Sequence, residues 1–168
     1  MRALRPRIAV AAVVFAAAGA LAGCTATTAA QPTPTATHAT DGAHASAMDI
    51  AVGDCLNDAD AGSTTATAAI VPCTGAHDSE AYADITLAGD AYPGLDAVQA
   101  QAQAGCQGDA FATFIGIASD DSTLQVSYYY PTEDSWAGGD RTVTCTVFAV
   151  DASGKTTPTT GTLKDSAK

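Results

Sequence analysis

Residues 95–114 read LDAVQAQAQAGCQGDAFATF, and their apolar side chains recur at the intervals of an amphipathic helix. The apolar stripe consists of Leu95, Val98, Ala102, Gly105 and Cys106. Glutamines occupy the opposite side, so the spacing predicts a helix with Cys106 on its buried face. Gly105 and Gly108 weaken the middle, and the segment can therefore also form two short helices, with residues 110–115 as the second.

Short runs typical of β-strands lie on both sides of this helical segment. Residues 66–73 and 81–87 precede it, and residues 124–130 and 142–150 follow it. The last run is the strongest, because Val143, Cys145, Val147 and Ala149 recur at every second position and would share one face of a strand. This order predicts a small α+β domain in which one main helical segment packs on an antiparallel sheet.

The connecting segments are predicted from composition. We expect an opening strand with a turn at residues 48–56, and a polar turn at residues 74–80 that places His77 in a loop or at a strand edge. We expect residues 132–140, which include Trp136, to form a loop. A short final strand is predicted around residues 159–163.

Four cysteines in the second part of the chain predict two disulfides. Cys55, Cys73, Cys106 and Cys145 are an even number, and the N-terminal features described below place them in an oxidising compartment. Three pairings are possible. We favour Cys55 with Cys73 and Cys106 with Cys145, because the other pairings require the first strand to lie close to the helix or to the last long strand.

The N-terminus has the layout of a secretory signal. Arg2, Arg5 and Arg7 precede an apolar run over residues 8–20, which is shorter than the ~20 residues that a membrane-spanning helix needs. The run ends in Leu21-Ala22-Gly23-Cys24, which resembles the lipobox of bacterial lipoproteins. We therefore expect residues 1–23 to be a cleaved signal peptide and Cys24 to carry a diacylglyceryl group. Acyl chains such as palmitate would then anchor the protein on the extracytoplasmic face of the cell membrane.

The composition after Cys24 separates a tether from a domain. Residues 24–47 contain mainly Thr, Ala and Pro and lack large apolar side chains, so we expect a flexible tether there and a single domain over residues 48–168. The chain has a formal net charge of −11. Loss of three signal arginines would leave four basic residues against 18 acidic ones, a charge of −14. We therefore expect no nucleic acid partner.

Glycine, proline and cysteine residues of the domain, with a few aromatic and charged ones, occur in a recognisable order. They are Gly53-Asp54-Cys55, Val71-Pro72-Cys73, His77, Glu80, Tyr92-Pro93-Gly94, Cys106, Pro131, Trp136, Gly139-Asp140-Arg141 and Cys145. This ordered set resembles the septum formation family of actinobacterial extracytoplasmic domains. The resemblance implies a cell-envelope role linked to division septa, favours four structural cysteines and supplies no catalytic mechanism.

Candidate binding residues have structural alternatives. Asp140 and Arg141 could recognise an anionic ligand or fasten a turn internally. Trp136 and the three tyrosines of residues 128–130 could stack on sugar rings of the cell wall or pack in the core.

His77 is the other candidate, either as a binding residue or as an acid/base group. Cys73 lies four residues before it and Glu80 three after it, but the chain has no Cys-x-x-Cys pair. We therefore predict no metal or other cofactor. Since no nucleophile motif is present, we expect a non-catalytic domain that binds a cell-wall component or an envelope protein; an extracytoplasmic hydrolase or metal-dependent enzyme centred on His77 is the alternative.

Overall fold

The computed structural model describes residues 44–58 and 67–168. The predicted signal peptide, the lipidation residue Cys24 and residues 24–43 of the predicted tether lie outside the described residues, as do residues 59–66. No helix in the described part of the chain has the length and apolar character that crossing a bilayer requires.

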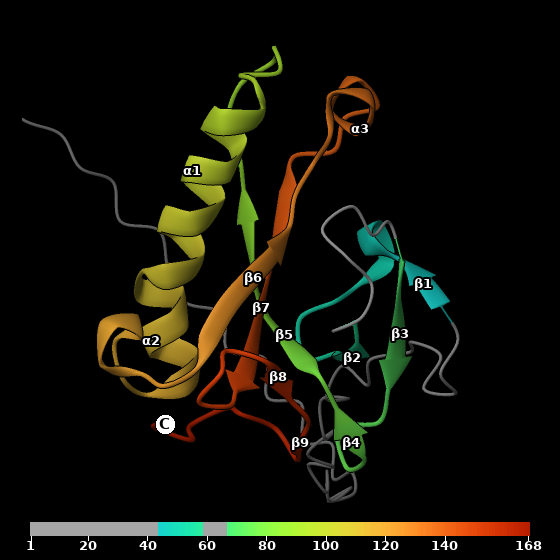
Figure 1. The fold of residues 1–168 in the computed structure, drawn as a ribbon. Coiled ribbons are helices and arrows are strands. Elements are labelled where there is room, and N and C mark those ends of the chain that lie inside the picture. The colour runs from blue at the N-terminus through green and yellow to red at the C-terminus, as the bar shows by residue number, and fades with distance from the viewer. Residues whose placement is uncertain (1–43, 59–66) are drawn as a thin grey trace, which may run out of the picture. The chain divides into compact units, whose positions relative to one another are not determined.

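The domain is built on an antiparallel sheet with main strand order β1-β3-β2-β5-β7-β6 (Figure 1). The strands are β1 (His44–Ser46), β2 (Cys55–Asn57), β3 (Thr67–Val71), β5 (Ser79–Thr86), β6 (Gln125–Tyr129) and β7 (Thr142–Val150). A short strand, β8 (Thr156–Thr157), pairs with Ala149 and Val150 at the C-terminal end of β7, outside the main strand order. Two more short strands, β4 (Ala76–His77) and β9 (Thr159–Thr160), pair with each other.

Two consecutive helices pack on one face of β5, β6 and β7. They are α1 (Leu95–Gln107) and α2 (Asp109–Ile115), and the break falls at Gly108. Val98 and Phe111 are fully buried with Val143 and Val147 of β7 in the main core. Burying each such side chain is worth about 1.5–3 kcal/mol. The predicted α+β class, with one main helical segment on an antiparallel sheet, is therefore confirmed.

Gly105 has a packing role in α1. A Cβ at this position would lie 3.1 Å from side-chain carbons of Ile85 in β5. The residue that weakens the helix intrinsically therefore lets α1 approach the sheet closely.

Two disulfides fasten this architecture. Cys55–Cys73 joins β2 to the turn after β3, and Cys106–Cys145 joins α1 to β7. These are the two pairs that the sequence favoured. Cys106 is fully buried, as the helical spacing predicted.

A second, smaller core lies under the first strands. It contains Ile50, Leu56, Ala68, Ile70 and Ala81. Tyr129 of β6 packs against this cluster, although β6 and β1 are the two ends of the main strand order. The sheet therefore curves enough for residues near its two edges to approach each other.

Three local predictions need correction. Residues 44–46 form β1 and pair with β3, so regular structure begins inside the segment predicted as a tether. Residues 47–49 form a 3-10 helix, η1 (Ala47–Asp49), in place of part of the predicted opening strand. The predicted loop at residues 132–140 contains the helix α3 (Glu133–Ala137). Thr132 and Ser135 form a capping box that starts α3, since each side chain accepts a hydrogen bond from the other's backbone N–H.

Candidate functional site

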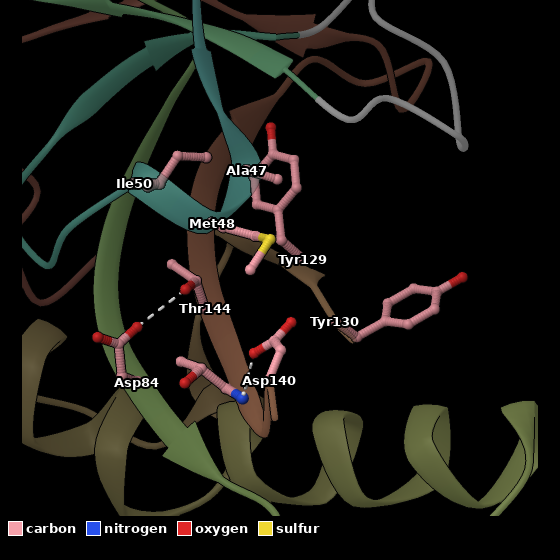
Figure 2. Close-up of a pocket in the computed structure, with 9 residues that line it drawn as sticks. Ala47, Met48, Ile50, Asp84, Tyr129, Tyr130, Asp140 and Thr144 are labelled. Atoms are coloured by element: carbon pink, nitrogen blue, oxygen red, sulfur yellow. Dashed lines mark hydrogen bonds between the residues drawn. The ribbon is translucent and has the colours of Figure 1, made fainter. Parts of the chain in front are cut away.

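The strongest candidate site is a pocket of about 240 Å³ on the face of the sheet opposite α1 and α2. We call it the Tyr129 pocket (Figure 2). The lining includes the strand residues Asp84, Thr142, Thr144 and Tyr129, together with Tyr130 just after β6 and Asp140 before β7. Ala47, Met48 and Ile50 of the segment after β1 form the remaining wall.

Strand register assembles the floor of this pocket. Thr144 of β7 lies opposite Asp84 of β5 and also opposite Tyr129 of β6. Directly opposed residues share a face of the sheet, so the three side chains form one row across three strands. Thr144 Oγ1 donates a hydrogen bond to Asp84 Oδ1 over 2.9 Å, the contact dashed in Figure 2.

A β-bulge places Asp84 on this face. Ala81 lies opposite Thr146 and Asp84 lies opposite Thr144, so three residues on β5 advance against two on β7. The bulge lies between Ala81 and Ala83 and changes which face later residues occupy. Without it, Asp84 would point into the helix-covered core.

Asp140 lines the pocket next to Thr142, where β7 begins. Its Oδ1 accepts a hydrogen bond from the Thr142 backbone N–H over 2.9 Å, and its Oδ2 accepts one from Ser135 Oγ over 3.1 Å. These contacts orient the carboxylate shown in Figure 2. Among the described residues that line the pocket, Asp84 and Asp140 are the charged groups, and none is Lys, Arg or His.

Tyr129 is held at its phenolic end. Its hydroxyl donates to Asp58 Oδ2 over 2.8 Å, and Ser79 Oγ donates to Asp58 Oδ1 over 2.8 Å. Burial, the charge of Asp58 and this hydrogen bond raise the pKa of Tyr129 well above its ordinary value. Tyr129 is therefore a fixed, neutral wall of the pocket.

Apolar surface faces these polar groups. Met48 is 69% exposed, and Figure 2 shows its side chain reaching over the pocket near Thr144. The ring of Tyr130 points outward in the same view, and its hydroxyl accepts a hydrogen bond from Gln99 of α1 over 3.2 Å. Ala47, Met48 and Ile50 therefore supply the apolar part of the lining, and the carboxylates and hydroxyls supply its polar part.

A second hollow of about 170 Å³ lies on the same face. Thr146 and Phe148 of β7 line it, together with Asp58 and Ser127. The Tyr129–Asp58 hydrogen bond joins the walls of the two hollows.

Trp136 and Arg141 form a structural cluster beside the pocket. The Arg141 guanidinium carbon lies 3.9 Å from the centroid of the Trp136 ring. Its nitrogens donate to the backbone carbonyls of Gly89, Asp90, Trp136 and Asp140 over 2.7–3.2 Å. Trp136 is only 3% exposed, and its indole N–H donates to the Asp90 carbonyl. This geometry matches the turn-fastening interpretation of Arg141 and removes Trp136 from the proposed stacking surface.

His77 lies elsewhere. His77 lies two residues before Ser79, which pairs with Phe148 of β7. Arg141 directly precedes Thr142, where β7 begins. Phe148 and Thr142 lie six positions apart along β7, or roughly 20 Å. Of the predicted binding residues, Trp136, Asp140 and Arg141 are therefore brought together and His77 is not.

Both ring nitrogens of His77 are used inside the fold. His77 has 0% exposure, and Nδ1 lies 3.0 Å from the Gly75 carbonyl. A carbonyl only accepts, so Nδ1 donates; in the neutral ring, Nε2 then accepts from Thr159 Oγ1 over 3.2 Å. His77 thus anchors β9, and the ring offers no surface to a substrate. The sequence interpretation of His77 as a loop or strand-edge residue missed this burial.

Several pocket residues escaped sequence reasoning. Asp84, Met48 and Thr144 were not among the predicted site residues. An acidic residue inside a β-type run was the available signal for Asp84, because a charged side chain there must lie on the open face of a sheet.

Fold and site together define a small, disulfide-fastened α+β domain with a polar pocket on its open sheet face. Residues 52–168 match the family model described as Septum formation, more than half of the chain. The chain therefore belongs to the septum formation family. No curated protein and no solved structure matches it. The septum formation family is not a known enzyme family. Membership in it supports a septum-related extracytoplasmic role.

Proposed function

We propose that this protein is a non-catalytic cell-envelope lipoprotein that contributes to septum formation by binding a cell-wall glycan in the Tyr129 pocket. The observation that carries the proposal is the row Asp84–Thr144–Tyr129 beneath exposed Met48. Sugars present hydroxyl groups at their edges and apolar C–H faces. Carboxylates and hydroxyls beside apolar walls fit that combination.

The charge of the pocket narrows the class of glycan. Within the part of the chain that the structure describes, no cationic side chain lines the pocket beside Asp84 and Asp140. An anionic polymer would meet like charges in a partly desolvated site, which is unfavourable. A neutral or amino-bearing glycan is therefore the preferred ligand, and an envelope protein is the alternative partner.

Attachment to the membrane is a separate part of the proposal. It rests on the sequence Leu21-Ala22-Gly23-Cys24 after a basic and apolar segment. Two acyl chains bind a bilayer stably, whereas one chain does so only marginally. Cys24→Ala should abolish incorporation of labelled palmitate and move the protein out of the membrane fraction. Retention of label in Cys24→Ala would contradict the anchor.

The glycan proposal is tested by sedimentation with purified cell-wall sacculi. The full chain should co-sediment, and Asp84→Asn should weaken binding about tenfold, as expected for loss of a charged hydrogen-bonding group. Asp109→Asn is the matched control, since Asp109 is an exposed residue at the start of α2. Equal binding by all three proteins, or none by the unchanged chain, would count against the pocket.

A further inference from the structure

We propose that reduction of the Cys55–Cys73 disulfide creates a buried site for one zinc ion. The donors are Cys55, Cys73, His77 and Glu80. Potential ligand atoms of Cys55, His77 and Glu80 already lie within 4.8 Å of one another. All three residues are buried.

Chain topology brings these donors together. β2 pairs with β5 so that Cys55 lies directly opposite Glu80. His77 belongs to β4, two residues before β5 begins. Cys55 and Glu80 therefore lie on paired strands, and His77 is held next to them by the pairing of β4 with β9, which is the rigid support that a metal site needs.

The donor set suits zinc. Zinc prefers four ligands from thiolate, imidazole and carboxylate groups. Cys73 supplies the fourth donor, because its Cα lies 5.2 Å from that of Cys55, and the pairing of Cys55 with Val71, two residues before Cys73, keeps the two cysteines near each other after reduction. Cys73 is partly exposed, which gives a reductant and the ion access to the cluster.

His77 is already oriented for such a role. A metal-binding histidine commonly donates its other ring N–H to a carbonyl, and Nδ1 of His77 does so to Gly75. Nε2 then carries the available lone pair, which now accepts a hydrogen bond from Thr159. At His77, zinc would replace that one hydrogen bond; at Glu80, it would use a lone pair that the hydrogen bonds from Thr162 and Leu163 leave unused.

The chemical step is balanced by a thiol or phosphine reductant. The reductant supplies two electrons and is oxidised, the S–S bond breaks, and each sulfur takes up one proton. The two protons come from the S–H groups of a thiol reductant, which becomes a disulfide, or from the water whose oxygen forms the phosphine oxide. Zinc binding then displaces the two thiol protons to solvent. The oxidised pair provides no thiolate, so the disulfide and the metal are alternative fastenings of the same strands.

The second disulfide provides an internal control. Cys106 and Cys145 are also fully buried, but their surroundings are the apolar main core. Among the described residues, the Cys55 cluster is the group of metal-binding side chains found. Reduction of Cys106–Cys145 should therefore create no zinc site.

The experiment measures zinc binding to the full chain by competition with a chromophoric chelator. A Cys24→Ser background removes the remaining thiol, and a phosphine keeps the protein reduced. We expect one zinc per reduced chain and none per oxidised chain. Cobalt(II) should give a thiolate charge-transfer band that is lost in Cys55→Ser.

Variants distinguish this site from general thiol chemistry. Glu80→Gln and His77→Ala should each weaken zinc binding by at least about 10-fold, since each removes a ligand. The double variant Cys106→Ser/Cys145→Ser should retain full binding. Near-UV circular dichroism verifies that Glu80→Gln is folded. No zinc binding by the reduced chain, unchanged affinity in folded Glu80→Gln, or loss of binding only in the Cys106/Cys145 variant would overturn the proposal.

Discussion

Glu80 Oε2 accepts a hydrogen bond from the backbone N–H of Leu163 over 2.7 Å, although the two residues are 83 positions apart. Glu80 Oε1 accepts a second from Thr162 Oγ1 over 2.6 Å. One buried carboxylate at the start of β5 thus holds the C-terminal segment, whose Leu163 side chain is part of the main core.

Glu80→Gln should destabilise the domain by about 1–3 kcal/mol. The buried carboxylate accepts one hydrogen bond at each oxygen, whereas the amide of glutamine can accept at only one atom. Urea unfolding measures the loss, and hydrogen exchange at Leu163 should accelerate. Glu133→Gln, on the exposed first turn of α3, is the control and should change little. Similar effects from both substitutions would refute the role of Glu80.

Arg141→Lys should lower the free energy of unfolding by about 1–3 kcal/mol. The planar guanidinium of Arg141 donates to four backbone carbonyls, and the ammonium group of a lysine cannot reach all four. Trp136 is the single tryptophan, so its fluorescence reports the site directly. The emission maximum should shift to longer wavelength as the ring becomes more exposed. Lys155→Gln, at an exposed position, should leave both emission and stability unchanged.

Removal of the two disulfides should have unequal effects. Cys106–Cys145 spans 39 residues and Cys55–Cys73 spans 18. In the chain-entropy model, a disulfide that closes the longer loop stabilises the folded state by about 4 kcal/mol, and one that closes the shorter loop by about 3 kcal/mol. Paired Cys→Ala variants, measured by denaturant unfolding, should show the larger loss for Cys106–Cys145. The reverse order would mean that local packing outweighs loop length.

Asp58→Asn should lower the pKa of Tyr129, because it removes the negative charge beside the phenol. Tyr82 provides a reference: burial alone raises its pKa, so the substitution should not affect it. Ultraviolet titration of tyrosinate formation measures both.

Tyr129 also links stability to pH. Its pKa is higher in the folded state than the ordinary value near 10, so its contribution is complete below that value and is lost as pH rises through the folded pKa. In Asp58→Asn this alkaline loss should be smaller. An unchanged alkaline profile would contradict the Asp58 contact.

Local periodicity was sufficient for much of the fold. The helical spacing of residues 95–114 and the alternation in β7 gave α1, α2, β7 and the buried position of Cys106. α3 was missed because it has only five residues, and its glycine-rich C-terminal side is typical of a loop. The Thr132–Ser135 capping pair was its one local signal.

The pocket depends on non-local geometry that composition does not encode. Asp84 reaches the open face only because the bulge shifts the register between β5 and β7. His77 is buried because β9, 82 residues later in the chain, supplies Thr159. Both outcomes follow from strand pairing, which sequence periodicity alone does not specify.

The most direct test of the glycan-binding account is an NMR titration of the full chain with soluble, uncharged cell-wall glycan fragments. The account predicts chemical-shift changes concentrated at Asp84, Thr144, Tyr129 and Met48, and their loss in Asp84→Asn but not in Asp109→Asn. Saturable changes located outside the Tyr129 pocket, or no changes at millimolar fragment, would contradict it.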